Sequence, residues 1–112
     1  MTENELSKIV FESGLKVHRA LGAGLLESAY EECLYYEITK AGVYVEKQKG
    51  LPLVYNENKL IVEVKSVEVL ADIHMAQILT YLKLSKCKLG LLINFNTVLF
   101  KDGVKRVING TL

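Results

Sequence analysis

Several residue types that mark specialised protein classes are scarce in this chain of 112 residues. It has no Trp, a single Pro and only two Cys. The cysteines, Cys33 and Cys87, lie far apart and form no C-x-x-C pair, which argues against a disulfide scaffold and against a structural zinc site. No low-complexity segment and no repeat of solenoid length occurs, so a fibrous or repeat architecture is not expected.

Long hydrophobic runs and a charge excess are missing as well. The longest apolar run, LGLLI, is far too short to cross a bilayer, and the first twenty residues carry three Glu residues and no signal-peptide pattern. The formal net charge is +1, so composition alone does not identify a nucleic-acid-binding protein. With 50% hydrophobic and 24% charged residues, the balance is that of a globular protein. We therefore expect one soluble, cytoplasmic domain over residues 1–112, with no membrane segment.

The spacing of apolar residues predicts mixed α and β structure. Helical spacing covers residues 4–21 and 25–41, with a GAG turn between them and Gly42 as a left-handed cap. A third helix is expected over 71–84. Strands are expected over 43–49, 51–55, 59–67 and 88–95, followed by a hairpin over 100–108 with its turn at Asp102-Gly103. This order, α-α-β-β-β-α-β-β, predicts an α/β (α+β) fold in which a small mixed sheet is flanked by helices.

Two of the predicted strands carry positional signals. Pro52 lies in the strand LPLVY and favours a place at a sheet edge or at a strand start, because proline cannot donate a ladder hydrogen bond. The run KLGLLINF is almost entirely apolar, which is typical of a strand that is covered on both faces.

The strand IVEVKSVE, residues 61–68, carries two charges on one face. Alternation of side chains places Glu63 and Lys65 on the same side, about 7 Å apart along the strand. A solvated strand face is the common explanation for such a pair. Here, however, the strand is otherwise apolar and expected to be central, where an unused charge is costly to bury. The next helix adds a polar stripe of His74, Gln77 and Tyr81, so we interpret the pair as part of a site.

Metal-assisted phosphodiester hydrolysis suits such a group of side chains. Carboxylate oxygens bind Mg²⁺ or Mn²⁺, and the metal polarises a phosphate and lowers the pKa of a bound water. A lysine beside the metal can orient that water or offset developing negative charge. The group nevertheless lacks a second acidic ligand.

Several motifs in fixed order carry a resemblance to a known family. GAGLLESAY contains G-x-x-E-x-x-Y at Gly24, Glu27 and Tyr30, EVK follows at 63–65, and HMAQILTYL supplies H-x-x-Q-x-x-x-Y at 74–81. With LGLLINF and KDGVKRVI, the sequence resembles the GxxExxY protein family, a branch of the PD-(D/E)XK nuclease-like superfamily, over about residues 9–108. The resemblance implies a restriction-endonuclease-like α-β-β-β-α-β core with a metal site on the central strands.

The resemblance also implies roles for individual residues. Glu63 would be a metal ligand, Lys65 the catalytic lysine and Glu27 an accessory acidic ligand. Gln77 and Tyr81 would be the helix pair that supports the site. The implied cofactor is Mg²⁺ or Mn²⁺, and the implied partner is nucleic acid, with DNA favoured over RNA.

The sequence departs from the superfamily motif in one respect. The motif has an Asp on the strand before E-x-K, but no Asp occurs between Met1 and Ala71. The segment from LPLVY to IVEVK is also short, as though a turn and most of a strand had been lost. Glu57 lies in the NEN turn, where we expect it to be too far from Glu63 to share a metal.

Three hypotheses therefore stay open. The chain is a metal-dependent nuclease, or it is a catalytically inactive relative that binds nucleic acid or a protein. As a third alternative, it is a shortened and marginally folded member whose exposed sheet edge favours a homodimer.

Three of the singled-out residues also have structural explanations. Glu27 lies in the first turn of a predicted helix, where a carboxylate interacts favourably with the helix dipole. Tyr30 lies on the apolar side of that helix and is expected to pack in the core. His74 is expected either to make a structural hydrogen bond or to take part in the site.

Overall fold

The computed structural model describes residues 1–47, 51–55 and 58–112. Helices α1 (Glu3–Leu21) and α2 (Glu27–Lys40) precede strands β1 (Leu51–Tyr55) and β2 (Asn58–Lys65). These are followed by α3 (Asp72–Ser85), β3 (Leu89–Asn94), the short 3₁₀ helix η1 (Phe100–Gly103) and β4 (Val104–Ile108). Among the residues described, no helix is both long and apolar enough to cross a membrane.

Within the described ranges, four strands form one sheet in the order β1-β2-β3-β4. β2 and β3 are parallel, with α3 as the crossover that a parallel pair requires, and the other two pairs are antiparallel. The E-x-K strand β2 is therefore central, as predicted from its sequence. Pro52 lies on the edge strand β1, which confirms the expectation from its missing N–H group.

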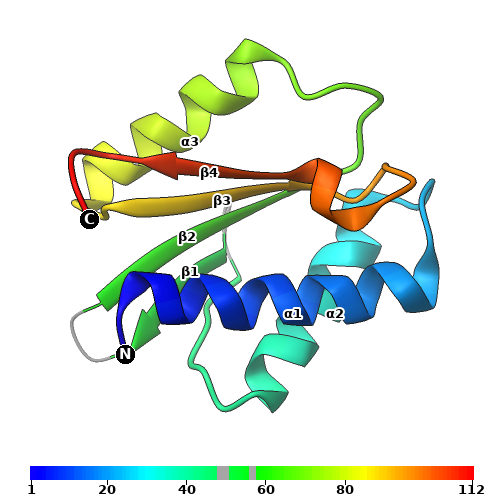
Figure 1. Cartoon of the computed structure of the whole chain (residues 1–112), viewed down its shortest axis with the longest axis horizontal. Helices are drawn as coiled ribbons and strands as arrows, with labels where there is room; N and C mark the ends of the chain where they lie inside the picture. Colours follow the sequence, from blue (N-terminus) through cyan, green and yellow to red (C-terminus); the bar gives the residue numbers. More distant parts are fainter. Residues whose placement is uncertain (48–50, 56–57) are drawn as a thin grey trace.

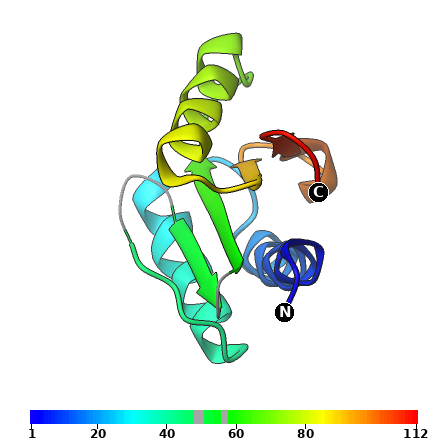
Figure 2. The same ribbon diagram turned by 90° about the vertical axis from the view of Figure 1, so that its left-hand side faces the viewer.

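Helices cover both faces of the sheet (Figures 1 and 2): α1 and α2 lie on one face and α3 on the other. Side chains of β2 alternate between these layers, so that Val62 and Val64 join the core beneath α1 and α2 while Ile61 packs with α3. All six residues of β3 are buried, as expected for a strand covered on both faces. The fold is thus the α+β fold that the sequence predicted, with a small mixed sheet flanked by helices.

Helix α1 illustrates how local sequence defines an element. Thr2 Oγ1 accepts a hydrogen bond from the Glu5 amide, and the Glu5 carboxylate accepts one from the Thr2 amide, each 3.1 Å long. The helix ends at Leu21, and the cap residue Gly22 has a φ of 70°, a conformation that favours glycine. At Gly14 the missing side chain leaves room for the Phe100 ring, because a Cβ there would clash with it.

The structure corrects the prediction of a strand over 43–49. Residues 43–47 contain only an isolated bridge at Val45, and positions 48 and 49 lie outside the described residues. Val43 and Val45 are buried in the core beneath α1 and α2. Their alternation therefore reflects packing of an extended segment on that core rather than pairing in the sheet.

The hairpin predicted over 100–108 is also wrong. Its first part, Phe100–Gly103, is the 3₁₀ helix η1, and β4 pairs instead with β3. Gly103 explains the difference, because a Cβ at this position would collide with the backbone carbonyl of Asn94. The glycine at position 103 allows its backbone to pack closely against that of Asn94, and it does not form a hairpin turn. The helix predicted from residue 25 begins later, at Glu27.

Candidate functional site

Glu63 and Lys65 lie on the α3 side of the central strand. Ile61 packs with the α3-side core cluster, and the two-residue period of a strand places Glu63 and Lys65 on the same face. Glu63 is only 6% exposed, whereas Lys65 is partly exposed. The carboxylate is therefore held inside the protein while the lysine beside it reaches towards solvent.

The backbone at the end of β2 is fixed by Asn94, whose side chain is 3% exposed. Asn94 Oδ1 accepts hydrogen bonds from the amides of Val67 (3.1 Å) and Asn96 (3.2 Å), and its Nδ2 donates to the Val67 carbonyl (2.9 Å). The Phe95 amide donates to the Lys65 carbonyl at 3.0 Å. Asn94 thus positions the segment that carries Lys65, a role that the sequence alone did not predict. The sequence signal that could have identified it is the position of Asn94 as the only polar side chain of β3, at the end of that strand.

Tyr30 joins the turn before α2 to the core. Its hydroxyl donates to the Gly22 carbonyl at 2.6 Å and accepts from the Leu25 amide at 3.1 Å. The ring is fully buried and stacks on Phe95, with centroids 4.6 Å apart and planes 4° from parallel. The tyrosine of the G-x-x-E-x-x-Y motif is therefore a core residue, as predicted, and it also determines the shape of the turn.

The same turn lies against the end of the E-x-K strand. The Ser66 hydroxyl donates to the Leu25 carbonyl at 2.6 Å, one residue after Lys65. Glu27, two residues after Leu25, is the first residue of α2, and it is exposed. The structure thus brings the Glu27 segment to the end of β2, but it leaves the carboxylate in solvent at the positive end of a helix.

A second carboxylate of α2, that of Glu31, is partly buried one turn after Glu27. Burial raises its pKa above the ordinary value; Lys47 opposes this shift, and the neighbouring carboxylates Glu32 and Glu27 add to it. Glu32 itself forms an ion pair with Lys47. The sequence reasoning did not single out Glu31, although its i, i+4 spacing from Glu27 was a visible signal.

The structure brings Gln77 and Tyr81 together on α3. Both line a cavity of about 310 Å³, whose described lining comes entirely from this helix. Gln77 is exposed, whereas Tyr81 is partly buried and packs on the α3-side core. His74 has a structural role, because its Nδ1 accepts a hydrogen bond from the Ala71 amide at 2.9 Å and thereby caps the start of α3.

A family model described as the PD-(D/E)XK nuclease superfamily matches residues 4–107. The chain belongs to this superfamily. The match agrees with the fold, in which the strand that carries E-x-K is central. No match was found among curated proteins or among solved structures.

PD-(D/E)XK nucleases generally use divalent metal ions, but the donor set of the residues that the structure describes does not fit such a site. Mg²⁺ is bound by oxygen ligands that include one or more carboxylates. In the residues that the structure describes, no three His, Cys, Asp or Glu side chains come together in a group that could hold a metal. The predicted ligands differ in surroundings, since Glu63 is buried and Glu27 is exposed.

The strand that precedes E-x-K supplies no further ligand. β1 is antiparallel to β2, and its sequence LPLVY contains no acidic residue. The described pairing between the two strands ends with Leu51 opposite Val62, one residue before Glu63. Glu57, the other carboxylate considered from the sequence, lies outside the described residues. Over the ranges that the structure describes, the side chains around E-x-K therefore do not form the ligand set that metal-assisted hydrolysis needs.

Proposed function

We propose that this chain is a GxxExxY-type, single-domain member of the superfamily that binds nucleic acid without hydrolysing it. The observation that carries the proposal is the composition of β1, which occupies the place of the strand with the motif Asp and offers only Leu, Pro, Val and Tyr. Because β1 adds no carboxylate to that of Glu63, the pair of strands makes a weak metal site, since a divalent ion prefers several negative oxygen ligands.

The groups that remain on the α3 side are suited to bind a phosphate backbone. Lys65 is partly exposed beside the buried Glu63, and its ammonium can pair with a phosphate oxygen. Gln77 is exposed on α3, and its amide can donate to phosphate or sugar oxygens. Contacts of this kind give affinity without sequence preference. We expect DNA to be bound more tightly than RNA, as the resemblance to the GxxExxY family implies.

Binding is tested by fluorescence anisotropy with labelled single-stranded DNA, duplex DNA and RNA at several salt concentrations. We expect affinity that falls with salt, and we expect Lys65→Gln to weaken it and to reduce the salt slope by about one. Lys40→Gln is the matched control, because it removes the same charge from the exposed end of α2 and should leave affinity unchanged. Absence of binding at every salt concentration would overturn the nucleic-acid proposal and favour a protein partner.

Metal binding is tested by calorimetric titration of Mn²⁺ into the wild type and into Glu63→Ala. We expect no saturable binding in either protein, and no cleavage of the three substrates with Mg²⁺ or Mn²⁺. Saturable binding that disappears in Glu63→Ala, together with cleavage, would contradict the proposal. It would instead support a metal-dependent nuclease with Glu63 and Glu27 as ligands.

A further inference from the structure

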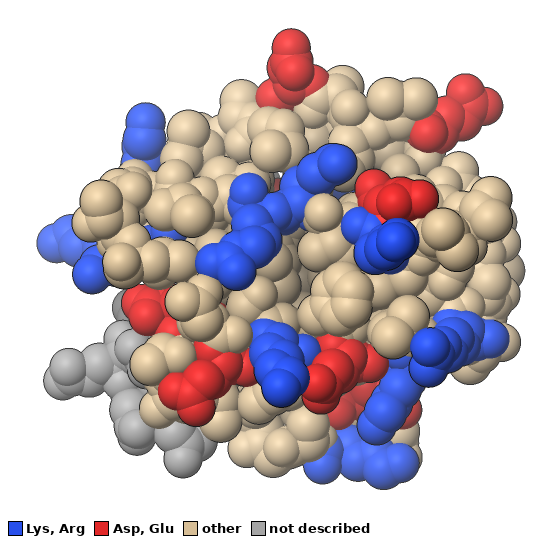
Figure 3. Space-filling view, in the orientation of Figure 1, with Lys and Arg blue, Asp and Glu red and all other residues tan. Residues whose placement is uncertain are grey.

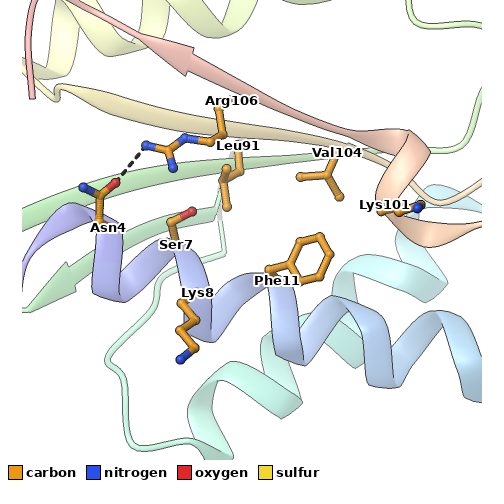
Figure 4. A pocket seen from close by; sticks show the side chains of 8 residues that line it. All are labelled: Asn4, Ser7, Lys8, Phe11, Leu91, Lys101, Val104 and Arg106. Carbon is orange, nitrogen blue, oxygen red and sulfur yellow. Dashed lines mark hydrogen bonds between the residues drawn. The ribbon is translucent and has the colours of Figure 1, made fainter.

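A groove of about 360 Å³ lies between α1 and the β4 side of the sheet (Figure 4). Its floor is apolar and is formed by Phe11, Leu91 and Val104. The volume falls within the range of roughly 300–1,000 Å³ that small-molecule sites occupy. An apolar floor of this size can cover one flat ring of a ligand.

The rim of the groove carries positive charge. Arg106 lies on β4 at one end and Lys101 on η1 at the other. Lys8 of α1 also lines the groove, but its amine points away from it in Figure 4. Figure 3 shows Lys and Arg side chains on both sides of a hollow in the middle of this face. In the part of the chain that the structure describes, neither Arg106 nor Lys101 has a carboxylate within ion-pair distance.

Polar groups at the Arg106 end are arranged before any ligand binds. Arg106 Nη2 donates to Asn4 Oδ1 at 2.8 Å, which holds the guanidinium at the groove and uses one of its five N–H donors. The Ser7 side chain is 8% exposed, lines the same groove and, in Figure 4, points between Asn4 and Leu91 into the groove. A hydroxyl that faces a cavity beside an arginine is suited to a polar ligand.

This groove lies on the opposite face of the sheet from Glu63 and Lys65. In the β3–β4 ladder Arg106 is opposite Leu91, which belongs to the core beneath α1 and α2. Lys105 is opposite Leu92, which belongs to the α3-side cluster. Neighbouring residues of β4 therefore serve different surfaces, and the groove is separate from the face with the E-x-K pair.

We infer that this groove binds a nucleoside phosphate. The planar guanidinium of Arg106 matches a phosphate group, to which it can donate two parallel hydrogen bonds. The base covers the apolar floor against Phe11, since aromatic side chains accept any base through its flat face. Ser7 and Asn4 line the same groove and supply polar groups for the sugar hydroxyls. The ligand comes either as a free nucleotide or as one unit of a single strand.

The inference does not rest on the proposed function, because its residues lie on the other side of the sheet. It is tested by titrating ¹⁵N-labelled protein with adenosine monophosphate, with inorganic phosphate and with a short single-stranded oligonucleotide. We expect adenosine monophosphate to shift the amide signals of Ser7, Phe11 and Leu91. Inorganic phosphate should shift them far less, because it has no ring to cover the floor.

Two variants of β4 form a matched pair for this test. Arg106→Gln should weaken nucleotide binding at least about tenfold, since it removes a charge-assisted hydrogen bond. Lys105→Gln removes the same charge from the opposite face and should leave the affinity unchanged. Thermal melting shows whether each variant is folded. If Arg106→Gln is unfolded, Lys101→Gln replaces it and should also weaken binding.

The outcomes separate the two ligand sources and the two proposals. Tighter binding of the oligonucleotide at the same amides identifies a strand as the source, and equal binding identifies the free nucleotide. The amide signals of Ser7, Phe11 and Leu91 report on the groove alone, so this test succeeds or fails independently of the proposed function. The inference is overturned if none of the ligands shifts the groove signals, if inorganic phosphate shifts them as strongly as the nucleotide, or if Lys105→Gln weakens binding as much as Arg106→Gln.

Discussion

On the α1–α2 face of the sheet, Tyr30, Phe95 and Phe100 pack together in a large apolar core, whereas on the α3 face a small aliphatic cluster lies next to the buried Glu63. Among the described residues, the first cluster buries sixteen hydrophobic side chains and the second five. Hydrophobic stabilisation follows the buried apolar area. The α1–α2 layer therefore supplies most of the hydrophobic stabilisation, which leaves the α3 layer more freedom to carry polar groups.

The largest expected effect comes from matched truncations in the two clusters. Leu34 on α2 and Leu82 on α3 are both fully buried, and Leu→Ala substitutions in cores cost about 2–5 kcal/mol. We expect Leu34→Ala near the top of this range and Leu82→Ala near the bottom, because the smaller cluster can collapse around the cavity. Chemical denaturation measures both values. A cost for Leu82→Ala equal to that of Leu34→Ala would refute the contrast between the layers.

Two glycine-to-alanine substitutions, one in each layer, test how tightly the layers are packed. An alanine at Gly14 would clash with the Phe100 ring, so Gly14→Ala should lower stability by about 1–3 kcal/mol despite the better helix propensity of alanine. A Cβ at Gly90 would lie 2.9 Å from Ile78 Cδ1, the flexible end of a side chain. Gly90→Ala should therefore cost less than Gly14→Ala. Thermal unfolding of the two variants decides the order, and the reverse order would count against a more rigid α1–α2 layer.

Tyr30→Phe examines the link between the turn before α2 and the end of β2. The hydroxyl bonds Gly22 and Leu25, and leaving such groups without a partner costs about 1–3 kcal/mol. Hydrogen exchange should speed up at the Leu25 amide, and through the Leu25–Ser66 bond it should also speed up around Ser66. Because the ring still stacks on Phe95, the α1–α2 core should stay protected. Unchanged exchange at Leu25 would show that the turn does not depend on this hydroxyl.

The smallest effect is a difference in pH dependence between two carboxylates of the α1–α2 layer. Hydrogen bonds from the Thr2 backbone and side chain lower the pKa of Glu5 below 4.5, so its stabilising contribution is present above pH 4.5 and is lost as the pH falls through the lowered pKa. Burial raises the pKa of Glu31 above 4.5, so its ionisation destabilises the fold as the pH rises from 4.5 through the raised pKa.

Two glutamine variants separate these opposite signs. Relative to wild type at neutral pH, Glu5→Gln should lower the melting temperature and Glu31→Gln should raise it slightly. Both differences should vanish in acid, where each glutamate is protonated in the folded and unfolded states. Melting curves across this pH range check the signs, and a shift in the same direction for both variants would contradict the assignment.

Sequence periodicity predicted those parts of the fold whose pattern is local. The helical spacing predicted α1 and α3, and the alternation in IVEVK placed Glu63 and Lys65 on one face, as the structure shows for β2. The strand over 43–49 and the hairpin over 100–108 failed because alternation reports which side is buried but not which segment is the pairing partner.

Contacts within the candidate site were predictable only where the residues share one element. Gln77 and Tyr81 lie together because one helix carries both. The role of Asn94 depends on its contact with Val67, 27 residues earlier in the chain, and that of Arg106 on Asn4, 102 residues away. No local pattern encodes such distant neighbours, so these contacts emerge only from the tertiary structure.

The alternation of side chains along β4 also limits how this protein can evolve. Arg106 faces the groove while Val107 packs on the α3-side cluster, and the connection 95–103 sets which residue faces which way. Two contacts hold that connection in place. Gly103 packs closely against the Asn94 backbone, and His18 Nε2 lies 2.8 Å from the Thr97 carbonyl oxygen. A one-residue insertion there that slid β4 by one position would turn the guanidinium into the α3-side core and the valine out to the groove. Insertions or deletions of two residues in this connection would keep the facing of the β4 side chains, so we expect them to be tolerated better than changes of one residue.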